Sequence, residues 1–339
     1  MLKYILYSLL LLSCLSSFAQ NRKRDFAIIL AEQRISNSLY NRIILVDGRF
    51  DTSHMGIVQL GAFNARAKVI PEVPFPVQLQ NVLDALVDSS AGNGGLLLHL
   101  HQLSFAEVTG AVSERGYYYF SADLYAGNNE SYQKIGKIDT VVLVKSFDVT
   151  KALFRHGSST INSFLGQHLL QKPASEEKFS YDDIVHMSDI EKKKIKLYTA
   201  TEYVNGIYDS YSSFFAQVPD RQATVEMKKG NISKIRIADS AGKMQKLKSD
   251  DMYAVVHEGV AYIATEYGYY LLRKENNDFY FIGKAKVTAS TGSVVAASLF
   301  FGVIGGLIAS NAHSDFEMKI DHRNGGFVRI REIITPVTQ

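Results

Sequence analysis

The sequence predicts an α+β protein of two domains, and three patterns in its 339 residues carry that prediction. An amphipathic helix and a three-stranded meander follow one another in the first half. Short strands separated by turn residues dominate the second half, and an uncharged apolar segment, residues 287–312, interrupts them. Roughly 320 residues remain after the leader described below, which is more than one hydrophobic core usually serves. Two domains are therefore expected.

The first domain is expected to span residues 20–172. Its opening strand is the apolar, β-branched run Arg42 to Asp47. Prolines at 71, 74 and 76 end any earlier element, and a helix follows whose apolar residues recur at helical spacing. Those residues are Leu79, Val82, Leu83, Leu86 and Val87. The turn Gly92-Asn93-Gly94-Gly95 closes this helix; it lacks the pattern of a dinucleotide fingerprint, so we assign it no cofactor.

Three strands and a helix complete this domain. Apolar residues alternate at Leu96, Leu98 and Leu100, then along residues 118–124, and a third strand covers residues 133–146. A helix over Val149–Gln171 follows, and its Gly157 is expected to be a weak point. The economical arrangement is a strand, a helix, a three-stranded meander and a closing helix.

The second domain is expected to span residues 201–339, after a charged connecting helix or linker over residues 173–200. Strand-like runs recur in this domain, and residues that tolerate tight backbone geometry separate them. The turn signals are Lys229-Gly230, Ser240-Ala241-Gly242, Glu258-Gly259, Tyr267-Gly268 and Asn276-Asn277. Residues 316–320 and 327–330 form a predicted hairpin around Asn324-Gly325-Gly326. A small antiparallel sheet or a partly open barrel is expected, with residues 287–312 as an apolar, glycine-rich helical insertion.

The chain begins with the features of a secretory signal peptide, assigned to residues 1–19. Lys3 precedes an apolar run, and Ser17 and Ala19 supply small residues before a cleavage site after Ala19. The single cysteine, Cys14, follows Leu-Leu-Ser and resembles the lipidation site of a bacterial lipoprotein. Ordinary cleavage and lipidation at Cys14 both remain open. Either route predicts export to the periplasm or outer envelope and leaves no thiol in the folded part.

The apolar segment 287–312 has a regular line of small residues. Ser298, Gly302, Gly306 and Ser310 fall four apart, which on a helix allows another backbone to approach closely. Three interpretations remain open: a membrane-spanning helix, a helix or helical hairpin buried in the second domain, and a helix that pairs with its copy in another subunit. The predicted hairpin disfavours a simple span, because its strands need the sheet that precedes the segment.

Composition excludes few functions, but it does not favour nucleic-acid binding. The formal charge is +3, and the densest basic clusters, residues 21–24 and 192–194, are interpreted as solvated surface. Motifs for nucleotide binding, serine hydrolysis and zinc proteolysis are missing. The sequence therefore favours a protein that is not an enzyme and that carries no cofactor.

Two residue pairs are the remaining candidates for chemistry. His99 and His101 are two apart on one strand, a spacing that metal sites use, although packed or solvated histidines are far more common. Asp47 and Asp51 could serve as paired carboxylates of a hydrolase, but they more plausibly cap a turn. The alternating residues Tyr117, Tyr119, Ser121, Asp123 and Tyr125 form a polar strand face that could be a recognition surface.

Two resemblances follow from these residues. The strand Ile43–Val46, followed by Asp47-x-Arg49 and then helix, meander and helix through Gln171, resembles the auxiliary lipoproteins of ABC-type envelope transport systems. The stretch from Tyr269 to Lys274, together with the glycine-rich run, is similar to secreted uncharacterised proteins of Bacteroidota. The first resemblance implies a role beside a transport complex, and the second implies only a compartment.

Together these observations predict a cell-envelope binding or assembly protein whose partners are an envelope protein, a membrane surface or a second copy of itself. A periplasmic hydrolase or metal-binding protein is one alternative. A structural protein that self-associates through Ser298, Gly302, Gly306 and Ser310 is another.

Overall fold

The computed structural model of the chain describes residues 22–61, 65–109, 114–128, 130–239, 241–284 and 315–333. The predicted signal peptide, Cys14 and the segment 287–312 with its line of small residues lie outside the described residues. The chain divides into two compact units, Met1–Val185 (unit 1) and His186–Gln339 (unit 2). This division falls inside the interval 173–200 that the sequence assigns to the connection.

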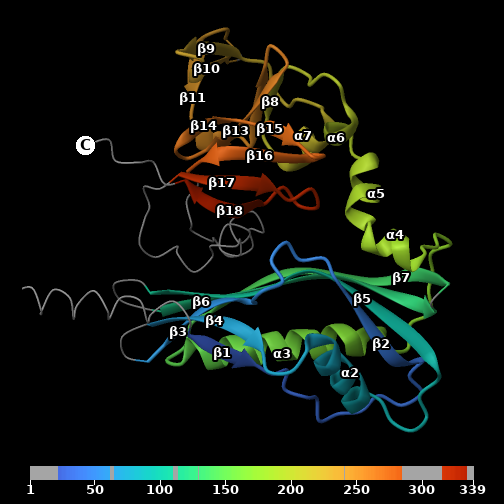
Figure 1. Cartoon of the computed structure of the whole chain (residues 1–339). Helices are drawn as coiled ribbons and strands as arrows, with labels where there is room; N and C mark the ends of the chain where they lie inside the picture. The colour runs from blue at the N-terminus through green and yellow to red at the C-terminus, as the bar shows by residue number, and fades with distance from the viewer. Residues whose placement is uncertain are drawn as a thin grey trace, which may run out of the picture. The chain divides into compact units, whose positions relative to one another are not determined.

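A mixed sheet forms the centre of unit 1, and helices α2 (Phe75–Leu86) and α3 (Val149–His168) cover one of its faces (Figure 1). The strand order is β1-β4-β3-β5-β6-β7, and β2 pairs in parallel with the first part of β5. The strands are β1 (Lys23–Phe26), β2 (Tyr40–Asp47), β3 (Gly56–Leu60), β4 (Ala65–Pro71), β5 (Gly94–Thr109), β6 (Glu114–Asn128) and β7 (Ser131–Val144). The predicted order of strand, helix, meander and helix is confirmed, and so is the α+β class.

Both helices of this face form for local reasons that the sequence displays. Pro74 occupies the N-cap position of α2 and a second proline lies in its first turn, where a missing N–H group costs nothing. Asp148 caps α3 by accepting a hydrogen bond from Lys151 N at 2.9 Å. Their apolar stripes pack on the sheet in one core with the inward residues of β5 and β6.

Gly157, expected as a weak point, lies inside the unbroken helix α3. A Cβ atom there would lie 3.0 Å from the ring of Phe105 and 3.2 Å from that of Tyr118. The glycine therefore lets the helix approach the sheet closely, and its cost in helix propensity is offset by that contact.

The strands β1, β3 and β4 were not predicted from the sequence. These strands are short, and β1 and β4 mix charged with apolar residues. They are fixed by pairing, since β1 lies parallel to β4 and β3 lies antiparallel to it. Local patterns therefore carry little signal for this edge of the sheet.

The connecting helix or linker expected over residues 173–200 does not form one continuous helix. It contains α4 (Tyr181–Val185), α5 (Met187–Lys193) and α6 (Lys196–Thr199). Ile195 has extended backbone angles, φ −100° and ψ 122°, and is buried in unit 2 together with Leu197 and Tyr198. A continuous helix could not place all three side chains in that core.

Antiparallel pairing builds the sheets of unit 2. The described residues of unit 2 form three sheets, in the orders β14-β13-β12-β8, β15-β16-β17-β18 and β11-β10-β9, so the antiparallel β domain is confirmed and is divided among more sheets than the one small sheet expected. The strand-like runs of the sequence are present as β9 (Thr224–Lys228), β10 (Asn231–Ala238), β12 (Ala254–His257), β13 (Val260–Thr265), β14 (Gly268–Leu271), β16 (Asp278–Gly283), β17 (Asp315–Ile320) and β18 (Phe327–Ile333). The elements that the sequence analysis did not separate are β8 (Gly206–Tyr208), α7 (Tyr211–Ala216), β11 (Met244–Leu247) and β15 (Arg273–Glu275).

The predicted hairpin β17–β18 is confirmed, and it joins the strand that precedes the apolar segment. β16 pairs antiparallel with β17, and Gly283 is the register partner of Phe316. The described residues on either side of the interval 285–314 are therefore neighbours in one sheet.

Candidate functional site

The first candidate site is the loop after β2, where the structure engages each predicted carboxylate separately. Asp47 forms a two-pronged ion pair with Arg49, at 2.9 Å to Nε and 2.7 Å to Nη2. The same guanidinium also donates to the backbone oxygen of His54 at 3.2 Å. Asp47 therefore orders the loop, which agrees with its interpretation as a turn residue.

Asp51 lies in a second group of contacts with Ser53 and His54. Its Oδ1 accepts from Ser53 N at 2.8 Å and from Ser53 Oγ at 2.6 Å, and its Oδ2 lies 3.3 Å from His54 Nε2. Burial raises the pKa of Asp51, but the Ser53 hydrogen bonds and the nearby His54 outweigh burial and leave that pKa lowered. This carboxyl group is held ionised.

The imidazole of His54 is committed on both nitrogens. Nδ1 accepts from Gly56 N at 2.9 Å, which leaves Nε2 to carry the proton toward Asp51. Burial lowers the pKa of His54 and outweighs the opposing effect of Asp51. Ser53 bonds to the acid and not to the imidazole, so Asp51, Ser53 and His54 lack the nucleophile-to-base contact of a hydrolase.

His99 and His101 have adjacent rings, with centroids 4.2 Å apart. His101 lies at a bulge in β5, between the register positions of Leu100 and Gln102. His99 is buried against Gly48, where a Cβ atom would lie 2.7 Å from His99 Nε2. The two imidazoles therefore lie side by side, and His99 is held there by packing against Gly48.

The second imidazole belongs to a buried ionic group on β5, β6 and β7. His101 Nε2 lies 3.0 Å from Asp123 Oδ2, and Lys134 Nζ lies 3.2 Å from the same oxygen. The Asp123 side chain has no exposed surface. Because an ammonium already occupies this oxygen, a cation would have to displace Lys134 to bind there. In the described part of the chain, no group of three or more His, Cys, Asp or Glu side chains is placed to hold a metal ion.

The strand face considered as a recognition surface is buried, so its tyrosines are not available to a partner. Tyr117, Tyr119 and Tyr125 are 4%, 3% and 0% exposed. Within unit 1, Phe179 contributes to this burial: its ring meets that of Tyr125 edge to face at 6.0 Å, and its backbone pairs with Tyr132. The connecting segment therefore covers part of the face that the sequence left open.

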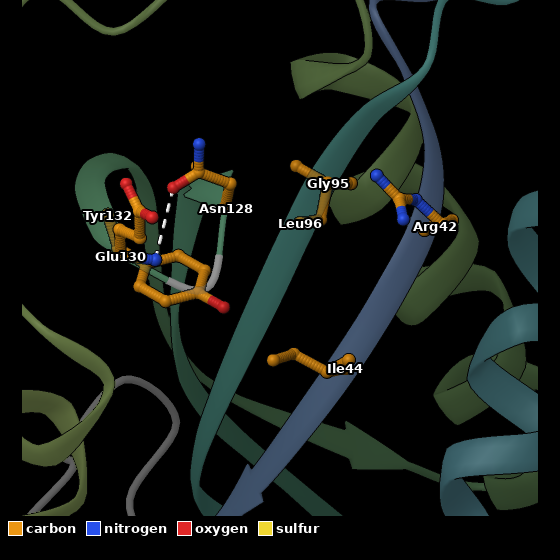
Figure 2. A pocket seen from close by; sticks show the side chains of 8 residues that line it. Arg42, Ile44, Gly95, Leu96, Asn128, Glu130 and Tyr132 are labelled. Atoms are coloured by element: carbon orange, nitrogen blue, oxygen red, sulfur yellow. Dashed lines mark hydrogen bonds between the residues drawn. The ribbon is translucent and has the colours of Figure 1, made fainter.

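Another candidate site is a cavity of about 370 Å³ in unit 1 (Figure 2). It lies where β2, the start of β5 and the β6–β7 turn meet, and it is lined by Arg42, Ile44, Gly95, Leu96, Gly127, Asn128, Glu130 and Tyr132. Gly95 and Gly127 are register partners, and a Cβ atom on Gly95 would lie 2.8 Å from the Gly127 carbonyl oxygen. Two facing glycines leave this part of the sheet without side chains.

The cavity combines apolar and charged groups. Ile44 is 40% exposed there, and the exposed Arg42 donates one hydrogen bond to the Asn93 carbonyl oxygen at 3.2 Å. On the other side, Asn128 Oδ1 accepts from Glu130 N at 3.1 Å and fixes the turn (Figure 2). A guanidinium has five donors, so Arg42 retains several for a bound anion.

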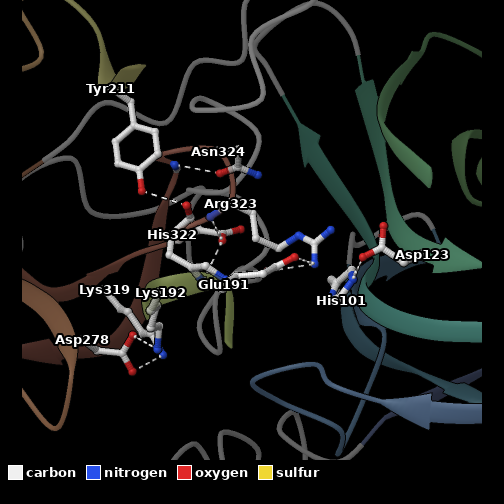
Figure 3. A network of polar contacts seen from close by, with 12 residues as sticks. His101, Asp123, Glu191, Lys192, Tyr211, Asp278, Lys319, His322, Arg323 and Asn324 are labelled. Atoms are coloured by element: carbon white, nitrogen blue, oxygen red, sulfur yellow. Dashed lines mark hydrogen bonds and ion pairs between the residues drawn. The ribbon is translucent and has the colours of Figure 1, made fainter. Parts of the chain in front are cut away.

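A polar network in unit 2 fastens the connecting helix α5 to its sheet (Figure 3). Glu191 lies 2.8 Å from His322 Nε2 and 3.4 Å from Arg323 Nη1. The next residue, Lys192, is buried and lies 2.7 Å from Asp278, which also pairs with Lys319 at 2.8 Å. The expectation that residues 192–194 are solvated is therefore wrong for Lys192. Glu191 and Asp278 each pair with two basic side chains of unit 2, which indicates a structural role for both carboxylates.

Among the described residues, none of the helices combines the length and hydrophobicity that crossing a bilayer requires. Cys14 and the line Ser298, Gly302, Gly306 and Ser310 lie outside those residues, so their predicted roles stay predictions.

The cavity was not predicted from the sequence. Arg42 and Ile44 were assigned to a strand and Gly95 to a turn. Correct registration of the meander would have placed Gly95 opposite Gly127, which is the one signal that could have revealed the bare sheet face.

No protein-family model and no curated protein matches the sequence. Among solved structures, the chain is similar to a Xanthomonas campestris protein of the DUF330 family, with 9% identity and a TM-score of 0.30. That likeness covers 43% of this chain and 95% of the other. A second structure, titled as an uncharacterized protein, has 12% identity and a TM-score of 0.24, and covers 41% of this chain and 98% of its own. Likeness at this level carries no conclusion about function.

Proposed function

We propose that this chain is an exported binding protein of the cell envelope, and that unit 1 takes a small ligand in the cavity beside Gly95 and Gly127. The observation that carries the proposal is the cavity itself. Its volume of about 370 Å³ falls in the range of roughly 300–1,000 Å³ typical of small-molecule sites.

The lining argues for a ligand with an apolar body and an anionic end. Ile44 offers an apolar wall, and the facing glycines allow close approach to the backbone. Arg42 supplies a positive charge with free donors at the rim, a group suited to carboxylate or phosphate. Binding is favoured over hydrolysis because Asp47, Asp51 and His54 are committed to contacts within their own loop.

Anilinonaphthalene sulfonate, a fluorescent probe with an apolar body and one sulfonate, tests this site. We expect wild-type protein to bind the probe, Arg42→Ala to weaken binding about fivefold or more, and Ile44→Asp to abolish it. Ile282→Asp on β16 is the matched control, because Ile282 and Ile44 are both 40% exposed. Equal binding by Ile44→Asp and Ile282→Asp would contradict the proposed site.

The resemblance of the first half to auxiliary lipoproteins of transport systems leads to a finer proposal, in which the protein works beside a membrane transport complex. Affinity purification of the exported chain from its own envelope fraction tests it. Recovery of a membrane transporter component supports the proposal, and recovery of the chain without any such component counts against it.

A further inference from the structure

Cations gather where the described chain begins. Arg22, Lys23 and Arg24 open this part of the chain, and Lys23 and Arg24 belong to β1. β1 pairs with β4, which carries Arg66 and Lys68. Asp25 is the one acidic residue on these two strands. Three of these cations, Lys23, Arg66 and Lys68, form one basic surface, which we call the β1–β4 basic face.

The cations of this face point to the same side of the sheet. Ala67 and Val69 are buried toward the helices, so the alternation along β4 directs Arg66 and Lys68 to the opposite side. Lys23 is the register partner of Lys68 and shares its side. Like charges directly opposite each other destabilise a strand pair, so this placement has a cost within the fold.

Among the described residues, Lys23, Arg66 and Lys68 make no ion pair or side-chain hydrogen bond. By contrast, the buried Lys192 of unit 2 pairs with Asp278, which also pairs with Lys319. The charge of Lys68 also acts on the neighbouring His54. Burial is the main cause of the lowered pKa of His54, and the positive charge of Lys68 lowers that pKa further.

We infer that the β1–β4 basic face attaches the protein to an anionic phospholipid surface, an inference that rests on the proposed place in the envelope. Charge complementarity carries it: unpartnered cations on one side of a sheet match a layer of lipid phosphates. The face also follows the predicted export signal closely, since Arg22 is the third residue after the cleavage site expected at Ala19. Lipidation at Cys14 would hold the same face beside the bilayer.

Attachment of this kind depends on salt and on each charge. Every cation near an anionic surface strengthens partitioning roughly fivefold at low ionic strength. Raising the salt from about 0.05 M to 0.5 M shortens the Debye length and removes most of the attraction. Reversing two of the charges, with Arg66→Glu and Lys68→Glu, should weaken partitioning at least ~20-fold.

Vesicle sedimentation tests the inference, with the full exported chain and vesicles of phosphatidylcholine alone or mixed with phosphatidylglycerol. We expect salt-sensitive binding to the mixed vesicles only, and its loss in the variant Arg66→Glu with Lys68→Glu. The control variant is Lys228→Glu with Lys246→Glu, at exposed positions of β9 and β11. It makes the same charge change in unit 2 and should bind like wild type. The first variant should keep its melting temperature, because Glu at position 68 would face Lys23.

Several outcomes would overturn the inference. Equal binding to pure phosphatidylcholine would mean apolar attachment, and equal loss in both double variants would mean that net charge alone decides. Binding to a DNA duplex at the same salt without binding to mixed vesicles would assign the face to nucleic acid. The cavity is tested separately, since the variant Arg66→Glu with Lys68→Glu should still bind anilinonaphthalene sulfonate; failure of either proposal is thus distinguishable from failure of the other.

Discussion

The side-chain amide of Gln80 forms hydrogen bonds with the backbone of β2 at Ile43, as a neighbouring strand would. Gln80 Oε1 accepts from Ile43 N at 3.0 Å, and its Nε2 donates to the Asn41 carbonyl oxygen at 3.0 Å. Gln78, from the same helix α2, does the same for residues near the end of β1, bonding Ile28 N at 2.8 Å and the Phe26 carbonyl oxygen at 3.1 Å. Two glutamines thereby satisfy backbone groups that would otherwise template further pairing.

Replacing Gln80 by leucine should expose the edge of β2. The variant loses two hydrogen bonds to the backbone, each worth about 1 kcal/mol, so we expect a loss of about 1–3 kcal/mol in local stability. Amide hydrogen exchange of the peptide containing Ile43 should speed up at least ~5-fold. Gln33→Leu, at an exposed position, is the control, and an unchanged exchange rate in Gln80→Leu would show that the amide does not protect this edge.

Stability should fall as the pH drops past the ordinary pKa of histidine because of His54. Burial lowers the pKa of His54 below its usual 6.5, so the unfolded chain takes up a proton before the folded protein does. The stability that this group contributes is present above about pH 6.5 and is lost as the pH falls through the lowered folded pKa. Thermal unfolding between pH 8 and pH 5 should show this loss in wild type and a flatter profile in His54→Asn. Parallel profiles would show that His54 is not the group responsible.

Asp123 should act as a structural ion. Removing one member of a buried ion pair leaves an uncompensated charge and costs about 3–5 kcal/mol. Lys134 is 35% exposed, so its share is screened, and we expect Asp123→Ala to lose about 2–4 kcal/mol in urea unfolding followed by circular dichroism. Asp250→Ala, at an exposed position, should change stability by less than about 0.5 kcal/mol.

A metal role for the histidines is tested alongside. If His101→Ala removed a bound metal that elemental analysis detects in wild-type protein, the structural account of this group would be wrong.

The apolar segment should be removable without loss of the fold of unit 2. Gly283 and Phe316 are register partners, so a short Gly/Ser linker in place of residues 287–312 can join β16 to β17. We expect an unchanged melting temperature. Fractionation with carbonate and high-salt washes then reports whether the segment contributes to membrane attachment, and Cys14→Ala separates out lipidation. A large drop in melting temperature would mean that the segment belongs to the core.

The sequence was most informative where a local pattern decides the structure. The spacing of Leu79, Val82 and Leu86 predicted α2, and Lys229, Glu258 and Asn276 adopt the positive φ values that their turn signals imply. Tertiary pairing decided the rest. β1 and β4 exist because they pair with each other, and Lys192 is buried because Asp278 lies opposite it.

The candidate site was less predictable than the fold for the same reason. The cavity depends on the registration of Gly95 with Gly127 across two strands, and a single sequence does not state that registration. The predicted pairs Asp47 with Asp51 and His99 with His101 were near each other in sequence, but their bonding partners, such as Arg49 and Asp123, decide what they do.

The central claim is that unit 1 holds a ligand in the cavity beside Arg42 and Ile44. Native mass spectrometry of the chain purified from its own envelope fraction tests it most directly. The account predicts a bound small molecule on wild-type protein and on Ile282→Asp, and its absence from Ile44→Asp. Wild-type protein without any bound molecule, or the same molecule retained by Ile44→Asp, would contradict the account.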